Sequence, residues 1–308
     1  MLGLNFNSLF DLAKVFNSEE VCIQYLEELR WKDGIAVSPF DPNSKVYKCA
    51  GNKYRCRTTG LYFNVKTDTM FDCSKIKLQK WFMAIWLITM HKKGISSLQL
   101  SRDIGVTQKT AWFMLQRIRN CYGMENNHIL DNKVETDETF VGGAEKNKHI
   151  NKRTKGTQGR SCKTKTPVFG MVEREGKLVA KVVKSTSSKH LTPQIIKYIK
   201  DGATLYTDEW IGYKNIGKLY DHLFVSHKKK EYVRDDVYTN TVEGFWSLFK
   251  RGIGGIYHFV SKKHLQSYVD EFVFRYNTRN FETETERFDH LLNNVENKYL
   301  PYKTLIAA

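Results

Sequence analysis

The sequence contains no long apolar run and no recognisable export signal. Its most apolar stretch, Trp81 to Met90, is ten residues long, whereas a membrane-spanning helix needs roughly 20 apolar residues. The amino-terminal apolar residues lack a preceding basic region and include Asp11 and Lys14, which argues against a signal peptide. We therefore expect an intracellular, cytoplasmic protein that makes no use of a membrane.

Proline and closely spaced cysteines are also scarce. The chain has five prolines and no low-complexity run, which excludes the fibrous and disordered classes. Its six cysteines are scattered without a close pair, so we expect reduced thiols rather than a disulfide framework. With 308 residues, the chain is longer than one typical core, and two or three domains are expected.

Acidic residues are in deficit relative to basic ones. The 49 lysines and arginines outnumber the 33 aspartates and glutamates and give a formal net charge of +16. Such a balance favours a polyanionic partner. Nucleic acid is the leading interpretation, and an anionic membrane surface is the alternative.

The first 125 residues show three different patterns. Residues 1–35 have the apolar spacing and capping residues of one or two amphipathic helices. In residues 36–75, aromatic and polar residues alternate between glycine turns, which is typical of a small antiparallel β unit. Residues 76–125 return to a helical pattern.

Within this helical segment the sequence has the layout of a helix-turn-helix. Ser96 begins one helix, Gly105 permits a tight turn, and Thr107 caps a second helix. In a DNA-binding helix-turn-helix the second helix enters the major groove. The alternative is a pair of packed helices in a bundle. Three basic residues on the second helix favour the DNA-binding interpretation: Lys109, Arg117 and Arg119.

Residues 132–285 have the pattern of a mixed α/β domain. Three strands are expected first, then a helix, two further strands and closing helices. This order fits one mixed sheet covered by helices. Between the first two strands, the segment from Lys146 to Lys165 has eight basic residues and no acidic one. Contact with DNA and simple solvation explain this segment equally well.

Two carboxylates of this domain lie in strands, where acidic residues are disfavoured. Asp137 is in the middle of the first strand, and Asp208 is at the end of a later one. A third acid, Glu243, lies on a helix with an aromatic face, and Lys250 follows two turns later on the same side. Converging carboxylates repel one another unless cations neutralise them, and their hard oxygen atoms suit Mg²⁺ or Mn²⁺. Two such ions would support in-line phosphoryl displacement, so the pattern predicts an enzyme that cuts or joins DNA.

Three runs resemble the DDE-type insertion-sequence transposases: VETDETFVGG, LYTDEWIGYKNI and NTVEGFWSLFKRGIGGIYHFVSKKHLQSYVDEFVFRYNTRN. The chain is most similar to the bacterial group that carries a zinc ribbon and a helix-turn-helix ahead of a ribonuclease H-like catalytic domain. The resemblance implies that Asp137, Asp208 and Glu243 form the metal-binding acidic triad and that Lys250 is the basic residue after the last acid. Asn240 would line the site, because some members of the group have asparagine in the third place.

The resemblance implies a DNA transposase that binds the terminal inverted repeats of an insertion sequence. In such enzymes a metal-activated water hydrolyses one phosphodiester, and the freed 3′-hydroxyl attacks target DNA. The implied cofactor is Mg²⁺ or Mn²⁺, as two ions. The implied partners are double-stranded DNA and further copies of the chain in a homodimer or higher oligomer, at the bacterial nucleoid. The candidate DNA contacts are Lys109, Arg117, Arg119, Lys152, Arg153, Arg251, His258, Arg275 and Arg279. For His258 a packing role is an equal alternative.

The expected zinc ribbon departs from the family pattern. Two CPxC-like knuckles are expected, but the matching positions begin with Ser38 and Cys56 and end with Asp41 and Thr59. Structural zinc needs four closely spaced cysteine or histidine ligands. We therefore expect the ribbon to fold through aromatic packing without zinc.

The expected fold class is an α/β multidomain chain. A helical and small β-ribbon DNA-binding part precedes a ribonuclease H-like mixed-sheet catalytic domain, and residues 286–308 form a C-terminal tail. A catalytically inactive, domesticated helix-turn-helix regulator is the alternative function. A plain metal-dependent nuclease or ribonuclease H is a second enzymatic alternative.

Overall fold

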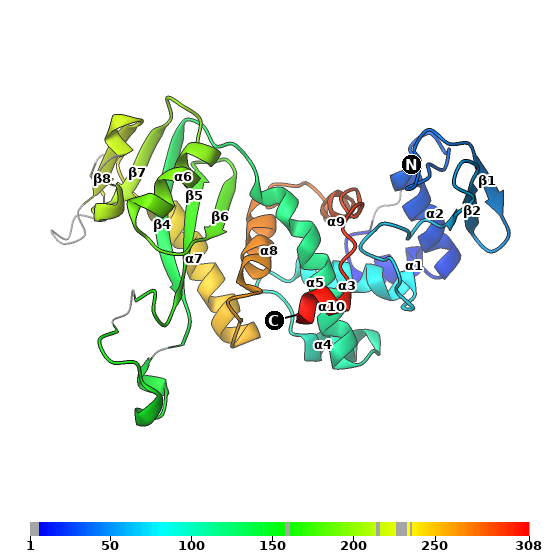
Figure 1. Cartoon of the computed structure of the whole chain (residues 1–308), viewed down its shortest axis with the longest axis horizontal. Helices are drawn as coiled ribbons and strands as arrows, with labels where there is room; N and C mark the ends of the chain where they lie inside the picture. Colours follow the sequence, from blue (N-terminus) through cyan, green and yellow to red (C-terminus); the bar gives the residue numbers. More distant parts are fainter. Residues whose placement is uncertain are drawn as a thin grey trace. The chain divides into compact units, whose positions relative to one another are not determined.

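The computed structural model describes residues 6–143, 145–157, 161–213, 216–225, 233–234 and 236–307 (Figure 1). The chain forms two compact units. The first unit consists of Met1–Cys121 together with Asn280–Ala308, and the second of Tyr122–Arg279. Among the described residues, no helix is both long enough and apolar enough to span a membrane.

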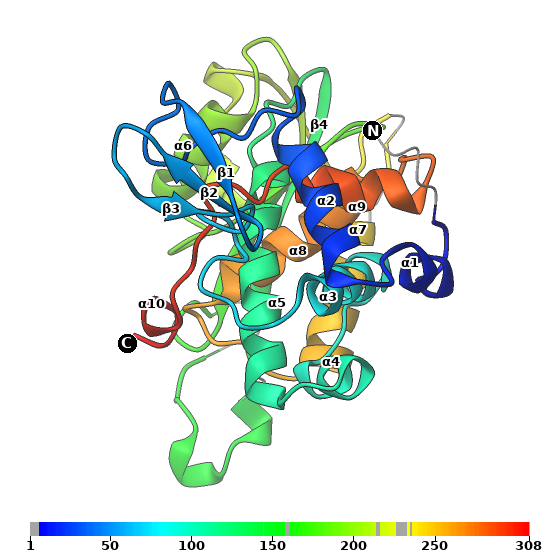
Figure 2. The ribbon, with the colours of Figure 1, turned by 90° about the vertical axis from the view of Figure 1, so that its right-hand side faces the viewer.

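The first unit combines helices with a three-stranded ribbon. Its helices are α1 (Leu9–Val15), α2 (Glu19–Arg30), α3 (Leu78–Met90), α4 (Ser97–Ile104), α5 (Gln108–Tyr122), α9 (Glu284–Leu292) and α10 (Tyr302–Ile306). The antiparallel ribbon has the order β1 (Val46–Cys49), β2 (Lys53–Cys56), β3 (Tyr62–Phe63). It lies beside α2 (Figures 1 and 2), where the Tyr54 hydroxyl donates to Glu27 Oε1 over 3.0 Å. The expected amino-terminal helices and small β unit are therefore present.

Capping residues explain where the helices of this unit begin. Ser18 accepts a hydrogen bond from the Val21 amide at the start of α2, and Ser96 does the same for Gln99 at the start of α4. Side-chain oxygen atoms at these positions satisfy amides that the first helical turn leaves without partners.

The carboxyl-terminal residues belong to the core of the first unit rather than to a separate tail. The Phe288 ring on α9 packs edge-on against the rings of Phe6 and Phe82, with centroids 5.3 and 5.5 Å apart. The Thr285 hydroxyl donates to the Phe6 carbonyl and accepts from its amide. The expectation of a C-terminal tail over residues 286–308 is corrected here, because its apolar partners lie at the other end of the chain.

The second unit is built on a mixed five-stranded sheet with the order β6-β5-β4-β7-β8. The strands are β4 (Lys133–Val141), β5 (Thr166–Glu173), β6 (Leu178–Val182), β7 (Thr204–Asp208) and β8 (Asp221–Val225). Strand β5 is antiparallel to β4 and β6, whereas β7 is parallel to both β4 and β8. This arrangement agrees with the predicted mixed sheet and with the predicted succession of strands along the chain.

Helices cover both faces of this sheet (Figure 1). Helix α6 (Ser188–Tyr198) packs on one face. Helices α7 (Asn240–Gly252) and α8 (Leu265–Asn277) pack on the other. Strand β5 is buried on both faces over six consecutive residues, as strands between two helical layers are.

Helix α7 approaches the sheet closely at Gly170 on β5. A Cβ atom at that glycine would lie 2.5 Å from Cζ2 of Trp246, so any larger residue would push α7 away. Gly170 pairs directly with Asp137 on β4. The glycine therefore brings the helix that carries Glu243 close to the strand that carries Asp137.

Candidate active site

The amino-terminal end of α7 is bound to β4 by one buried carboxylate. Glu135 is fully buried, and its Oε2 accepts hydrogen bonds from the amides of Thr241 and Val242 over 2.8 and 3.2 Å. Its Oε1 accepts from the Thr241 hydroxyl over 2.9 Å. A carboxylate at a helix amino terminus satisfies unpaired amides and opposes the positive end of the helix dipole. Glu135 thus fixes where α7 begins.

Arg174 on the loop after β5 completes this anchor. Its Nε donates to Glu135 Oε1 over 2.8 Å, and its two other nitrogen atoms donate to the carbonyls of Asp236 and Tyr238. The guanidinium lies between two aromatic rings, 4.1 Å from the centroid of Tyr206 and 3.7 Å from that of Tyr238. Glu135 of β4 therefore binds the first turn of α7 directly, and through Arg174 it also holds Asp236 and Tyr238, which precede that helix.

Sequence reasoning overlooked Glu135 and Arg174. The signal was present, because Glu135 is an acid inside a strand and lies two residues before Asp137. Residues two apart in a strand share a face. The position of Arg174 gave no comparable local signal, because its partners come from the distant segment that precedes α7.

Asp137 and Asp208 lie on neighbouring parallel strands and on the same face of the sheet. The pairing of β4 with β7 places Glu135 beside Tyr206. This pairing ends there, and Asp137 and Asp208 each lie two residues further along their own strands, with Asp208 as the last residue of β7. The Trp210 amide donates to Asp208 Oδ1 over 2.9 Å, which holds that carboxylate against the turn after β7.

The neighbouring acid Glu138 belongs to the other face. Its Oε1 accepts a hydrogen bond from the Tyr213 hydroxyl. Burial raises the pKa of Tyr213 well above its usual value, and the Glu138 carboxylate adds to this effect. Because adjacent strand residues point to opposite sides, Glu138 is separated from the face that carries Asp137.

Glu243 and Asn240 lie in the first turns of α7, on its exposed side. The Thr239 hydroxyl donates to Glu243 Oε1 over 3.1 Å. The anchoring of the helix by Glu135 places this part of α7 at the face of the sheet that carries Asp137. The predicted burial of the aromatic face of α7 is confirmed, since Phe245, Trp246 and Phe249 are at most 3% exposed.

The donor types at this face suit a hard divalent cation, because they are carboxylate oxygen atoms. Their arrangement is not that of a closed metal site. Within the described part of the chain, no group of three or more histidine, cysteine, aspartate or glutamate side chains is close enough to hold a metal ion. The fold therefore places two of the carboxylates on neighbouring strands and the third on α7, without gathering all three among the described residues.

Three of the predicted DNA contacts are instead buried in the structure. Arg117 is 2% exposed and donates to the carbonyls of Met70, Asp72 and Leu300. Arg119 is 1% exposed. The Arg275 side chain is 8% exposed and forms a 2.5 Å ion pair with Glu271. These three predictions are corrected, because a buried guanidinium cannot reach a DNA phosphate.

The remaining predicted DNA contacts lie on the surface, as does the predicted site residue Lys250; these contacts are Lys109, Lys152, Arg153, Arg251, His258 and Arg279. Lys109 is near the amino terminus of α5, where its Nζ lies 5.0 Å from the centre of the Tyr302 ring. Lys152 and Arg153 lie in the basic segment between β4 and β5, of which residues 158–160 are outside the described residues. Lys250 and Arg251 lie near the end of α7.

The predicted helix-turn-helix layout is present as two helices and a tight turn. Gly105 ends α4 with φ of +62°, a conformation that glycine adopts at little cost. The Thr107 hydroxyl accepts from the Thr110 amide over 3.2 Å. This geometry does not by itself distinguish a DNA-binding pair from a pair of packed helices.

The ribbon brings the expected zinc-knuckle positions together around a single thiol. Ser38 and Cys56 are both fully buried. Burial raises the pKa of the Cys56 thiol, but hydrogen bonds involving Ser38, Ser44 and Thr59 outweigh this effect and lower the pKa to about 6. Hydroxyl groups thus surround the cysteine where the family pattern would supply further thiols.

Comparisons with known proteins agree with the resemblance seen in the sequence. Residues 129–277 match the family model of the ISXO2-like transposase domain. A protein of Halobacterium salinarum, described as an uncharacterized protein in the transposable element ISH50, is 28% identical over 275 residues. The aligned region covers 85% of this chain and 92% of that protein. The predicted resemblance to insertion-sequence transposases is therefore confirmed.

Solved structures add only a distant likeness. A Mos1 transposase paired-end complex with the left transposon end is 11% identical, with a TM-score of 0.27 over 94% of each chain. A pre-cleavage Mos1 transpososome is 12% identical, with a TM-score of 0.26 over 93% of this chain and 96% of that one. Scores this low do not establish a common fold.

Proposed function

We propose that this chain, a relative of the ISXO2-like transposases, binds the terminal inverted repeats of an insertion sequence and catalyses DNA strand cleavage and strand transfer. One observation carries the proposal. Within the segment that matches the transposase domain, Asp137 and Asp208 belong to neighbouring parallel strands, each two residues beyond the paired Glu135 and Tyr206. The net charge of +16 supports a polyanionic substrate.

In this proposal Asp137, Asp208 and Glu243 would hold Mg²⁺ or Mn²⁺, and the second unit has a ribonuclease H-like fold. The bound metal would supply activation of water and neutralisation of phosphate charge. The Trp210 amide orients the Asp208 carboxylate, and the Thr239 hydroxyl orients Glu243. Lys250 binds a DNA phosphate through its ammonium group, and Asn240 lines the site.

The proposal is tested by strand transfer with labelled terminal repeats and Mg²⁺, after the DNA beside the gene has been sequenced to identify those repeats. We expect Asp137→Asn and Asp208→Asn to lower the rate by more than about a hundredfold, since even partners outside the first coordination shell cost about 10- to 100-fold. Asp201→Asn, an exposed acid of the same unit, is the matched control. Wild-type rates in both strand variants would refute the catalytic proposal.

An inactive DNA-binding regulator is the second candidate function. It is favoured by one observation, namely that the described acids do not form a closed group of three. Repeat-specific binding without cleavage in Mg²⁺ or Mn²⁺ would support this candidate. Cleavage without joined products would instead indicate a plain nuclease.

A further inference from the structure

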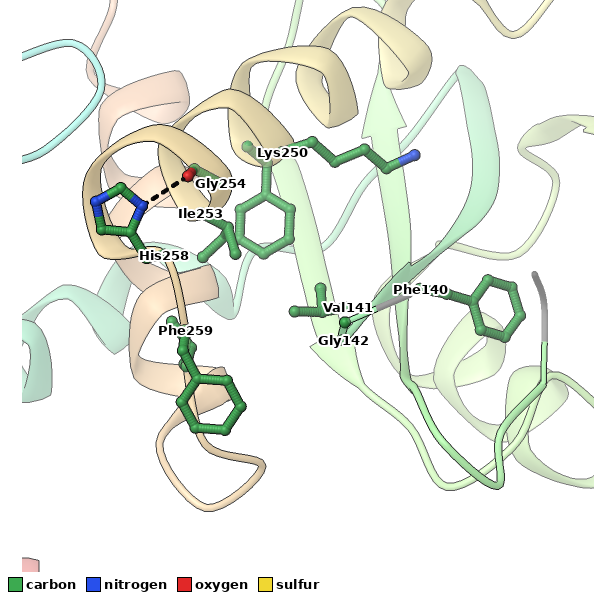
Figure 3. A pocket seen from close by; sticks show the side chains of 11 residues that line it. Phe140, Val141, Gly142, Lys250, Ile253, Gly254, His258 and Phe259 are labelled. Atoms are coloured by element: carbon green, nitrogen blue, oxygen red, sulfur yellow. Dashed lines mark hydrogen bonds between the residues drawn. The ribbon is translucent and has the colours of Figure 1, made fainter. Parts of the chain in front are cut away.

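A pocket of about 260 Å³ lies beyond the carboxyl end of α7 (Figure 3). Phe140 and Val141 at the end of β4 line one side of it. Phe249 of α7 and Phe259 line the other side. We call this cavity the α7 pocket. Most of its lining is apolar and aromatic, and the second unit alone supplies every residue that lines it.

The segment after α7 supplies several residues that line this pocket, among them Ile253, His258 and Phe259. Residues Ile253–Tyr257 form a π-helical turn, and His258 follows with φ of +57°. The His258 Nδ1 atom lies 3.1 Å from the Gly254 carbonyl oxygen, which ties the imidazole to that turn (Figure 3). The chain then turns outward and leaves the Phe259 side chain 79% exposed. An exposed phenylalanine at the mouth of an apolar pocket offers a ring for stacking.

The charge around the pocket indicates what kind of ligand it would take. None of the described residues that line the pocket is acidic. Two of them, Lys250 and His258, have basic side chains. The next residue, Arg251, is also exposed. A fitting ligand therefore combines a flat apolar group with a negative charge, and a nucleotide has both. Base stacking on aromatic side chains is a general means of holding single-stranded nucleic acid.

The position of the pocket relative to Glu243 suggests where this nucleotide lies on the DNA. Lys250 is seven residues after Glu243 on α7, a rise of about 10 Å at 1.5 Å per residue. Nucleotides of one strand are about 3.4 Å apart along a duplex, so this rise corresponds to about three nucleotides. Because bases inside a duplex are stacked and paired, only an unpaired base could enter the α7 pocket.

We propose that the α7 pocket receives one unpaired nucleobase of the DNA strand that lies along α7, within about three nucleotides of the cleavage point, while Lys250 holds an adjacent phosphate. This inference rests on the proposed function, because it assumes that DNA lies at the face of Asp137. It adds a base-binding subsite that neither the acidic residues nor the family match implies. Phe259 stacks on the base, and Phe140 and Phe249 enclose it.

The test compares the affinity of the full chain for three labelled duplexes at one fixed salt concentration, by fluorescence anisotropy. One duplex is fully paired, one has a single unpaired adenine, and one has an abasic nucleotide at the same place. We expect the wild type to bind the unpaired adenine at least about fivefold more tightly than the abasic duplex, since stacking on an aromatic side chain contributes strongly per base. Phe259→Ala should remove this preference, and Phe259→Trp should retain it.

Phe224→Ala is the matched control, because Phe224 is an exposed phenylalanine of the same unit that does not line the pocket. It should keep the preference. Equal binding of the adenine and abasic duplexes by the wild type, or an unchanged preference in Phe259→Ala, would overturn the subsite while leaving DNA binding intact. Failure to bind any duplex would overturn the proposed function, and this inference with it.

Discussion

Glu135 connects β4 to the first turn of α7, although it is not a proposed metal ligand. It is fully buried and accepts hydrogen bonds from two α7 amides, a threonine hydroxyl and Arg174. The position of Glu243 depends on this carboxylate because both belong to the contact between β4 and α7. A change at Glu135 should therefore affect stability and activity together.

We expect Glu135→Gln to lower the free energy of unfolding by about 2 kcal/mol, because hydrogen bonds to a charged acceptor are lost, whereas Asp236 keeps its 2.9 Å ion pair with Arg174. The Arg174 side chain is only 11% exposed, so water cannot replace the lost carboxylate. Urea denaturation measures the change. Glu175→Gln, an exposed acid in the adjacent turn, is the control, and equal stability of the two variants would contradict the anchoring role.

The Cys56 thiol gives a pH-dependent contribution to stability. Its pKa is about 6 in the folded chain and about 8.5 in an unfolded one. A lowered pKa stabilises the folded state above the unfolded pKa, and this contribution is lost as the pH falls through about 6. We expect a thiolate absorbance titration to show a midpoint near 6 that is missing in Cys56→Ser. The stability difference between wild type and Cys56→Ser should grow from pH 6 to pH 9; a difference independent of pH would contradict this.

Among the helices, α5 carries both an exposed and a buried basic residue. Lys109 lies on the exposed first turn, whereas Arg117, about two turns later, is buried against the carbonyls of Met70, Asp72 and Leu300. Only the amino-terminal part of α5 can therefore present a cation to DNA.

We expect Lys109→Ala to weaken DNA binding and to reduce the slope of log affinity against log salt by about one, as loss of one phosphate contact does. Arg117→Ala should instead lower the free energy of unfolding by about 2 to 3 kcal/mol, because hydrogen bonds from a charged donor are lost. Binding is measured by salt titration and stability by urea denaturation. Lys32→Ala, an exposed lysine of the same unit, should change neither, and an unaltered salt slope in Lys109→Ala would refute the contact.

The ribbon β1–β3 is an element whose stability we attribute to side-chain packing rather than to a metal. The rings of Trp31, Tyr54 and Phe63 form one aromatic cluster, with the Tyr54 and Phe63 rings stacked 5.6 Å apart. Elemental analysis of the purified chain should therefore find no stoichiometric zinc, and chelators should leave its thermal unfolding unchanged. One tightly held zinc per chain would contradict this prediction.

At the scale of the whole molecule, the two units have separate cores, and the first draws on both ends of the chain. Phe288 is fully buried and contacts the rings of Phe6, Phe16 and Phe82. We expect Phe288→Ala to destabilise the first unit by about 3 to 5 kcal/mol, the usual cost of truncating a core phenylalanine.

Amide hydrogen exchange can show whether Phe288→Ala destabilises the first unit alone or both units. Peptides from residues 6–121 and 280–307 should lose protection in Phe288→Ala, whereas those from 122–279 should keep it. Phe10→Ala, at a phenylalanine that is 68% exposed in the same unit, should behave as the wild type. Loss of protection throughout both units would contradict the division between their cores.

Much of the local structure could be predicted because it depends on neighbours in the sequence. Ser96, Gly105 and Thr107 marked the boundaries of α4 and α5, since caps and left-handed turns have strong residue preferences. The strands of the mixed sheet followed from their apolar composition, and Asp137 and Asp208 were conspicuous as acids inside strands. The prediction failed for Arg117, Arg119 and Arg275, because helical periodicity does not show which distant segment will cover a basic residue.

The succession of strands and helices, the excess of positive charge and the three candidate acids could all be identified from the chain alone, because each is encoded in residue type and local spacing. Folding was needed to show that Glu135 anchors α7, that α9 completes the first core, and that an aromatic pocket lies beyond the candidate site. These features join residues that are far apart in the chain, and their contacts exist only after the sheet has paired and the helices have packed on it.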